Sequence, residues 1–208
     1  MPRISYRPYE DLDPRSRAYI DYARDHGTPR PESQAIRAHV PEVLEAFTQA
    51  WRMTFEQGVL DNATKELCRL YVSKSVECEY CGTQRSELAT AGGVDERKID
   101  ELMDFERSDR YTDRERAALR YAQAIAWDAA LADDQVWEDL HHHFTEPQLV
   151  ELGFFIALTL GQQRWIKTLK VGHLEYLPDT TAGLLPGFSV AVPDPAGPGP
   201  HDPGRRAF

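Results

Sequence analysis

The chain is poor in cysteine and has no long apolar run, and both shortages narrow what it can be. Its 208 residues include three cysteines, too few for the disulfide framework of a small secreted domain. The longest apolar stretch, Phe154–Leu160, falls well short of the roughly 20 residues that a membrane span needs. The N-terminus lacks the apolar centre of a signal peptide. We therefore expect a cytoplasmic protein without a membrane partner.

Basic clusters and strand patterns are missing as well. The chain has 24 Lys and Arg against 34 Asp and Glu, a formal net charge of −10. Nucleic acids are bound chiefly through clustered Lys and Arg, so a nucleic-acid partner is not expected. Nowhere do apolar and polar residues alternate as in a half-buried strand, and we predict an all-α fold.

Apolar residues recur every three or four positions along most of the chain, which predicts about six to eight helices. Thr112 and Thr145 each begin a capping-box pattern. The last helix is so apolar that we expect it at the centre of the fold or in a subunit contact. The predicted helices cover 33–57 (which Pro41 can divide), 62–75, 77–91, 95–105, 134–143 and 146–170, and a further helix begins at Thr112 and includes Ile125.

The two ends of the chain differ from this helical domain, which we assign to residues 33–177. Residues 1–32 are polar and rich in proline, with one short helical candidate at Arg15–Arg24, and we expect an arm lying on the domain or on a neighbouring subunit. Residues 178–208 hold seven of the fourteen prolines. Such a tail buries too little apolar surface to offset its ordering entropy, although its few apolar residues could strap onto a neighbour.

Cys78 and Cys81 are the residues that point most directly to chemistry. Their Cys-x-x-Cys spacing allows a small disulfide ring, or lets one thiol resolve what the other has attacked. In a reducing compartment such a pair is typically catalytic or metal-binding. Glu66 lies twelve residues before Cys78, where it can face the sulfurs from the preceding helix. Cys68 stands alone among apolar residues and is expected to be a small buried hydrophobe.

The run Gly58–Gly93, with Glu66 and the cysteine pair, resembles the carboxymuconolactone decarboxylase and AhpD-like alkylhydroperoxidase family. That family's signature is Glu, then Cys-x-x-Cys, then His four residues later, and the similarity covers about residues 35–172. The resemblance implies an AhpD-like helical bundle that forms homo-oligomers, either trimers or hexamers. This chain has Arg85 in place of the signature histidine. Arginine cannot pass a proton near pH 7, but a cation one helical turn from Cys81 would favour its thiolate.

The resemblance implies a thiol-dependent peroxidase that needs no cofactor and no metal. Cys81 would attack a hydroperoxide and become a sulfenic acid, and Cys78 would condense with it to a disulfide that a dithiol reductant protein reduces. Glu66 would hand on the proton through water. Cys81 would lie at the start of a helix and near Arg85. The helix dipole and the arginine charge would then lower the pKa of Cys81 below its free value of about 8.5. A surface position for Arg85, or a salt bridge to Glu66, is an equal alternative.

Other interpretations remain open at this point. The chain could be a non-redox decarboxylase or isomerase of a small carboxylated or lactone substrate, with Arg85 holding the carboxylate. It could also be a scaffold, or a metal site formed by Cys78, Cys81 and Glu66, although two cysteines are too few for a closed zinc site. Tyr80 is expected to serve in packing.

Two further polar groups complete the candidates. Gln162, Gln163 and Arg164 interrupt the last apolar helix, and they could line either a substrate pocket or a subunit contact. The histidines 141–143 are consecutive, so they point in different directions and mark a helix end rather than a metal site.

Overall fold

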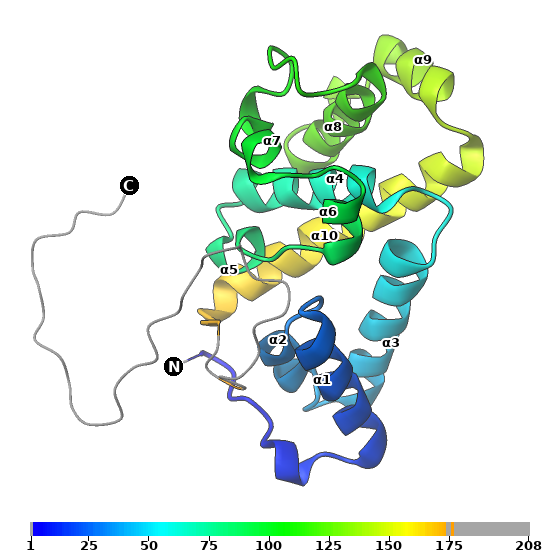
Figure 1. Ribbon diagram of the computed structural model, residues 1–208. Coiled ribbons are helices and arrows are strands. Elements are labelled where there is room, and N and C mark those ends of the chain that lie inside the picture. Colours follow the sequence, from blue (N-terminus) through cyan, green and yellow to red (C-terminus); the bar gives the residue numbers. More distant parts are fainter. Residues whose placement is uncertain (1, 174–175, 177–208) are drawn as a thin grey trace, which may run out of the picture.

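The described part of the chain is helical throughout. A computed structural model describes residues 2–173 and residue 176, so the predicted tail of residues 178–208 lies outside the described residues. Within them the chain forms ten α-helices and no strand, and the all-α prediction is confirmed (Figure 1). Three of these helices have only four or five residues, which is why their number exceeds the predicted six to eight.

Three long helices, α4, α8 and α10, form the centre of the fold. They span Asn62–Ser75, Asp113–Ala126 and Glu146–Leu169, and α10 runs diagonally past the other two (Figure 1). Each contributes fully buried leucines to one shared core, among them Leu67, Leu119 and Leu152. Their apolar stripes face one another, as the helical periodicity predicts.

Helices α1, α2 and α3 form a second layer beside this centre. They span Pro14–His26, Pro31–Arg37 and Pro41–Trp51, and each begins at a proline, where the missing N–H costs nothing. The break predicted at Pro41 is therefore confirmed. A π-helical segment, Arg52–Glu56, continues α3 and stacks Phe55 on Phe155 of α10 with 5.4 Å between ring centroids. This contact packs the end of the α3 segment against α10.

Shorter helices complete the fold. Between α4 and α8 lie α5 (Glu79–Gly82), α6 (Glu87–Ala91) and α7 (Glu96–Asp100), and α9 spans Asp134–His143. The helix predicted over 95–105 is wrong in its extent, because α7 ends at Asp100 and a 3-10 helix takes up the chain at Leu102.

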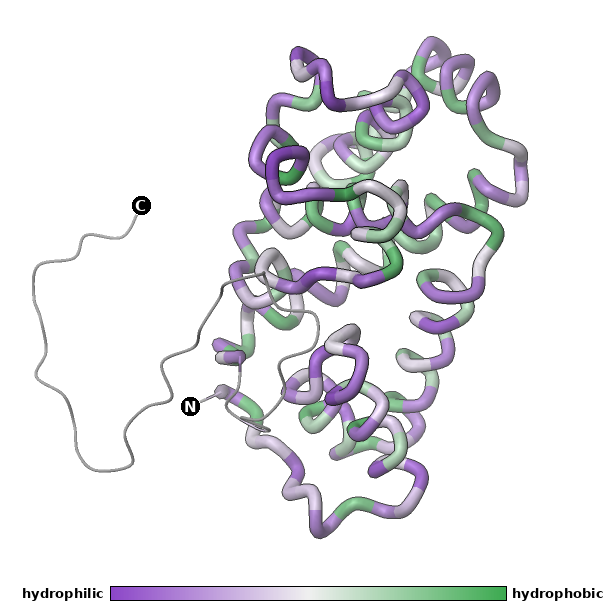
Figure 2. The backbone as a smooth tube through the Cα atoms, in the orientation of Figure 1, coloured by the Kyte–Doolittle hydropathy of each residue, from purple (hydrophilic) through white to green (hydrophobic). Residues whose placement is uncertain are grey.

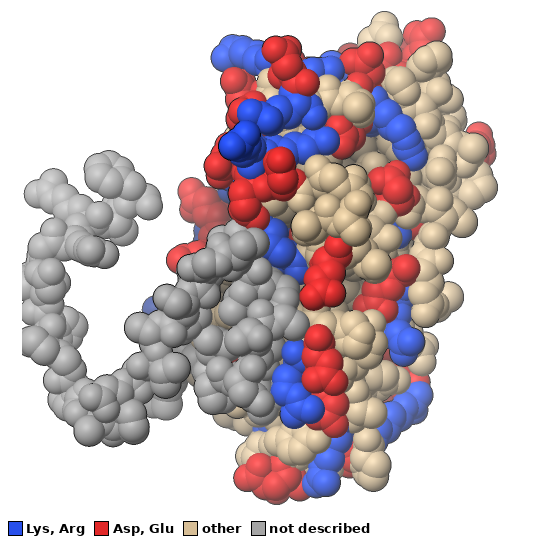
Figure 3. Space-filling model, viewed as in Figure 1, with Lys and Arg blue, Asp and Glu red and all other residues tan. Residues whose placement is uncertain are grey.

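The outer surface is mixed in character. Hydrophilic and hydrophobic residues are mixed along each helix (Figure 2). Acidic and basic side chains are interspersed on the face seen in Figure 3. Even α10, the longest helix described, does not combine the length and apolar character needed to cross a membrane. Its Val150 and Phe154 are 73% and 53% exposed in the single chain, and assembly into an oligomer stays a prediction.

Glu151 of α10 fastens the loop that precedes α4. Its carboxylate accepts hydrogen bonds from the backbone N–H groups of Val59 and Leu60 at 2.6 and 3.1 Å, and from the Lys65 ammonium at 3.1 Å. Lys65 is only 1% exposed, and burial lowers its pKa. A Cβ atom at Gly58 would collide with this carboxylate. The missing side chain at Gly58 thus leaves the space that the Glu151 carboxylate occupies.

We predict that Glu151→Gln lowers the free energy of unfolding by about 3 kcal/mol, because it leaves a buried ammonium without its counter-charge. Urea denaturation would measure this loss. The control is Asp104→Asn, which breaks a pair with Arg107 whose side chains are 66% and 84% exposed, and its effect should stay below about 1 kcal/mol. Equal effects of the two substitutions would contradict the role of Glu151.

Candidate active site

Cys78 and Cys81 form a disulfide within one turn that follows α4. Helix α4 ends at Ser75, and Glu77 adopts a left-handed conformation with φ of 52° that redirects the chain. Cys78 then precedes α5, with its backbone N–H donating to the Ser73 carbonyl at 2.9 Å. Both cysteines are buried and pack against Ile166 of α10. The last turn of α4 and the end of α10 thus fix the position of the disulfide.

The continuous helix predicted over 77–91 is wrong. Helix α5 ends at Gly82, and Ser86 begins α6 by accepting a hydrogen bond from the backbone N–H of Ala89. Arg85 therefore does not lie one helical turn beyond Cys81 on the same helix. A helix of four residues also has too few aligned peptides to provide the dipole that was expected to lower the Cys81 pKa.

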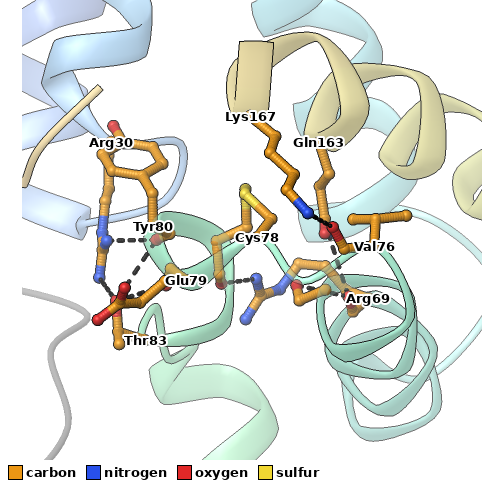
Figure 4. Close-up of a disulfide and its surroundings, with 11 residues drawn as sticks. Arg30, Arg69, Val76, Cys78, Glu79, Tyr80, Thr83, Gln163 and Lys167 are labelled. Atoms are coloured by element: carbon orange, nitrogen blue, oxygen red, sulfur yellow. Dashed lines mark hydrogen bonds between the residues drawn. A yellow bond between two sulfur atoms is a disulfide. The ribbon is translucent and has the colours of Figure 1, made fainter. Parts of the chain in front are cut away.

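Arg69 brings Glu66 into the site. Its guanidinium donates to both carboxylate oxygens of Glu66 at 2.7 Å, and the two side chains are 2% and 1% exposed. The same guanidinium donates to the carbonyls of Cys81 and Gln84 at 2.7 and 2.8 Å. Glu66 is therefore linked to the cysteine turn through Arg69. Figure 4 shows Arg69 and Arg30 on opposite sides of this turn.

Arg85 lies elsewhere. It forms a two-pronged ion pair with Glu96 at 2.7 and 3.0 Å and donates to the carbonyls of Gly82 and Gln84. Its guanidinium thus ties the loop after α5 to the start of α7. Both alternatives for Arg85 are therefore wrong: its side chain is only 12% exposed and pairs with Glu96, while Glu66 pairs with Arg69.

Cys81 lines a small cavity between the N-terminal layer and α10. The cavity has a volume of about 40 Å³, enough for a few water molecules or the polar head of a ligand. Its wall combines aromatic rings with arginine and glutamine side chains. The lining residues include Arg30, Arg37, Phe47, Trp51, Arg69, Tyr80, Cys81, Thr159, Gln162 and Gln163.

Arg30 and Tyr80 close one side of this cavity. The Arg30 guanidinium donates to the carbonyl of Tyr80 and to the hydroxyl of Thr83 and lies 5.0 Å from the centroid of the Tyr80 ring (Figure 4). The Tyr80 hydroxyl donates to Glu32 at 3.0 Å. Burial and the charge of Glu32 raise the pKa of Tyr80 well above 10, so the phenol stays protonated. Tyr80 packs as predicted, and it also anchors the cysteine turn to α2.

Cys78 lines a separate surface hollow. This hollow has a volume of about 720 Å³ and is bordered by Glu77, Arg85 and Glu96. The two cysteines of one disulfide thus line different spaces, Cys81 the inner cavity and Cys78 the outer hollow.

The other candidates can now be placed. Gln162 and Gln163 both line the Cys81 cavity, which favours the pocket over the subunit contact. Arg164 of the same group does not line the cavity but is exposed and donates to the Ala126 carbonyl. The histidines 141–143 form the end of α9 as predicted. Among the described residues, no group of three or more His, Cys, Asp or Glu could hold a metal ion. Cys68 is fully buried, and burial raises its pKa, so the prediction of a small buried hydrophobe is confirmed.

Sequence reasoning missed three arginines of the site. Arg69 follows Glu66 by three residues, a spacing at which opposite charges meet on one helix face, so this partner could have been found. Arg30 and Arg37 come from a region interpreted as an arm and the start of a helix. Only the packing of α2 against the cysteine turn and α10 brings them to Cys81, and no local pattern signals that contact.

Comparison with known proteins gives one family. Residues 41–124 match the model of the Carboxymuconolactone decarboxylase family. An uncharacterized protein of Mycobacterium tuberculosis is 34% identical over 97 residues, which cover 47% of this chain and 34% of that protein. This chain thus spans about a third of the length of that curated relative.

Solved structures share the fold at low identity. An uncharacterized peroxidase-related protein with an alkylhydroperoxidase AhpD core from Ralstonia eutropha superposes with a TM-score of 0.73 at 19% identity, covering 89% of this chain and 97% of that one. A variant of the debrominase Bmp8, in complex with 2,3,4-tribromopyrrole, gives 0.63 at 22% identity, covering 73% and 81%. Residues 41–124 of this chain thus resemble the Carboxymuconolactone decarboxylase family, and the described residues have the AhpD-like fold.

Proposed function

We propose that this chain is an enzyme of its superfamily that uses Cys78 and Cys81 as a dithiol to reduce organic hydroperoxides. The observation that carries the proposal is the setting of Cys81. Cys81 lines a small cavity, its disulfide partner is three residues away, and the buried guanidinium of Arg69 donates to its carbonyl. A nearby cation favours the thiolate, which is the reactive form of cysteine.

The reaction has two steps. The Cys81 thiolate attacks one peroxide oxygen, an S–O bond forms, the O–O bond breaks, and the departing alkoxide takes a proton to become an alcohol. The Cys78 sulfur then attacks the Cys81 sulfenic acid and releases water as the disulfide forms. The dithiol loses two electrons and the hydroperoxide gains them. A dithiol reductant protein restores the thiols by thiol–disulfide exchange.

Glu66 acts in this scheme as a positioning residue. Both of its oxygens are occupied by Arg69, which makes it a weak base and a good orienter. The pair holds the guanidinium against the carbonyls of the cysteine turn, and it balances the positive charge beside Cys81.

A second candidate is reductive removal of a halide from an aromatic ring. Its support is the aromatic wall of the cavity, formed by Phe47, Trp51 and Tyr80, together with the debrominase that shares the fold. The two thiols would give up two electrons and two protons, R–Br would become R–H, and bromide and one proton would be released. Bromide release from a bromopyrrole by the reduced protein would test it, and its absence would remove this candidate.

The non-redox alternative relied on Arg85 to hold a substrate carboxylate. Arg85 already binds the carboxylate of Glu96 in two hydrogen bonds. A substrate would have to displace this partner, so the contact does not support that role for Arg85.

We predict that a stoichiometric pulse of cumene hydroperoxide removes two free thiols from the reduced protein, and that Cys81→Ser abolishes the loss. Cys68→Ala is the matched control, because Cys68 is buried in the core and should leave the rapid loss unchanged. A thiol count before and after the pulse measures both. Retention of the two-thiol loss in Cys81→Ser would overturn the proposal.

We also predict that Glu66→Gln shifts the pH midpoint of Cys81 alkylation downward by about one unit. The substitution removes the negative charge that balances Arg69, so the thiolate of Cys81 is favoured at lower pH. Iodoacetamide labelling of the reduced protein between pH 5 and 9, read at Cys81 by mass spectrometry, would measure the shift.

Glu96→Gln is the control for this shift, because Glu96 pairs with Arg85 and its side chain is 44% exposed. Its midpoint should move by less than about a third of a unit, since the exposed pair is screened by solvent. An equal shift in both variants would show that Arg69 is not the cation that sets the reactivity of Cys81.

A further inference from the structure

The Cys81 cavity contains buried polar groups that lack partners within the described part of the chain. They are the Arg30 Nε–H, the Trp51 Nε1–H, the Thr159 hydroxyl and the Gln163 Oε1 atom, and all four residues line this cavity. Each residue is at most 6% exposed. Because an unpaired buried polar group is costly, so many around one cavity indicate that a polar ligand completes them.

Arg37 is the most unusual group in the lining. It is 3% exposed, and within the described residues its guanidinium donates only to amide oxygens, those of Gln34 at 3.0 Å and Gln162 at 2.7 Å. It also stacks over the Phe47 ring, 3.6 Å from the centroid. Burial lowers the pKa of Arg37 to about 9, so it remains charged at neutral pH.

The charges around the cavity do not balance. Arg69 is paired with Glu66. Burial lowers the pKa of Arg30 to about 10, and the charge of the nearby Glu32 carboxylate opposes this shift. Among the described residues, no ion pair joins Arg37 to a carboxylate. A buried cation without a counter-ion is strongly unfavourable. The cavity therefore carries one positive charge that a ligand could neutralise.

We propose that the Cys81 cavity binds the carboxylate head of a small aromatic organic acid, with Arg37 as its main anchor. The volume of about 40 Å³ accommodates a carboxylate, and the unpaired Arg30 and Trp51 donors supply further hydrogen bonds. Gln162, which is only half-buried, stands where the cavity nears the surface. The aromatic part of the ligand would lie there and against Phe47 and Trp51. Resting on the proposed dithiol function, this assigns a carboxylate and an aromatic ring as the features by which the cavity recognises the hydroperoxide that reaches Cys81.

Calorimetric titration of the disulfide form with benzoate and with benzamide tests the site. The two probes have the same ring and nearly the same size, but only benzoate is charged. We expect benzoate to bind at least tenfold more tightly than benzamide, and Arg37→Gln to abolish this preference. Arg164→Gln is the control, because Arg164 is an exposed residue of α10 that donates to the Ala126 carbonyl away from the cavity.

A second measurement needs no variant at Arg37. In the reduced wild-type protein, benzoate should slow alkylation of Cys81 at least fivefold, and benzamide should not. Equal binding of the two probes, no binding of benzoate, or unchanged benzoate binding in Arg37→Gln would each overturn the inference. Because the titration uses the disulfide form, its failure would leave the thiol-loss result intact, and failure of thiol loss would leave the anion site intact.

Discussion

The buried guanidinium of Arg69 is the contact on which the arrangement of the site depends. Its donors reach a carboxylate on its own helix and two carbonyls of the chain that returns after the cysteines. Helix α4 and the cysteine turn are thereby joined through charged hydrogen bonds whose side chains are at most 2% exposed. Removing either charge would leave the other buried and unpaired. The loss of one partner therefore destabilises the fold far more than it would in a surface ion pair.

The rest of the fold supports this contact. The leucine-rich faces of α4, α8 and α10 provide the rigid core that holds Arg69 and Gln163 in place, and the Gln163 amide donates to the carbonyl of Arg69 at 3.2 Å. Lys167 of α10 donates to the Val76 carbonyl at the end of α4 (Figure 4). The cysteine turn is therefore held by side chains from regular helices, although it is itself irregular.

Sequence patterns predicted the long helices well and the site only partly. The periodic apolar residues of α4, α8 and α10 located the core, and Glu66 with the two cysteines located the candidate site. The segment after Cys81 was predicted poorly, because its helical composition gives no sign that Arg85 turns away to Glu96. Arg30 and Arg37 could not be assigned, since their role comes from contacts with residues about 50 and 125 positions away.

In the proposed dithiol reaction, the two spaces beside the disulfide would allow its two reaction partners to be selected independently. The inner cavity has room only for a small molecule or for part of one, whereas the outer hollow is wide and bordered by charged side chains. A protein large enough to carry electrons cannot enter the first space, but it can approach the second. Size alone would then keep the electron donor away from the position of the electron acceptor, so neither has to leave before the other can approach.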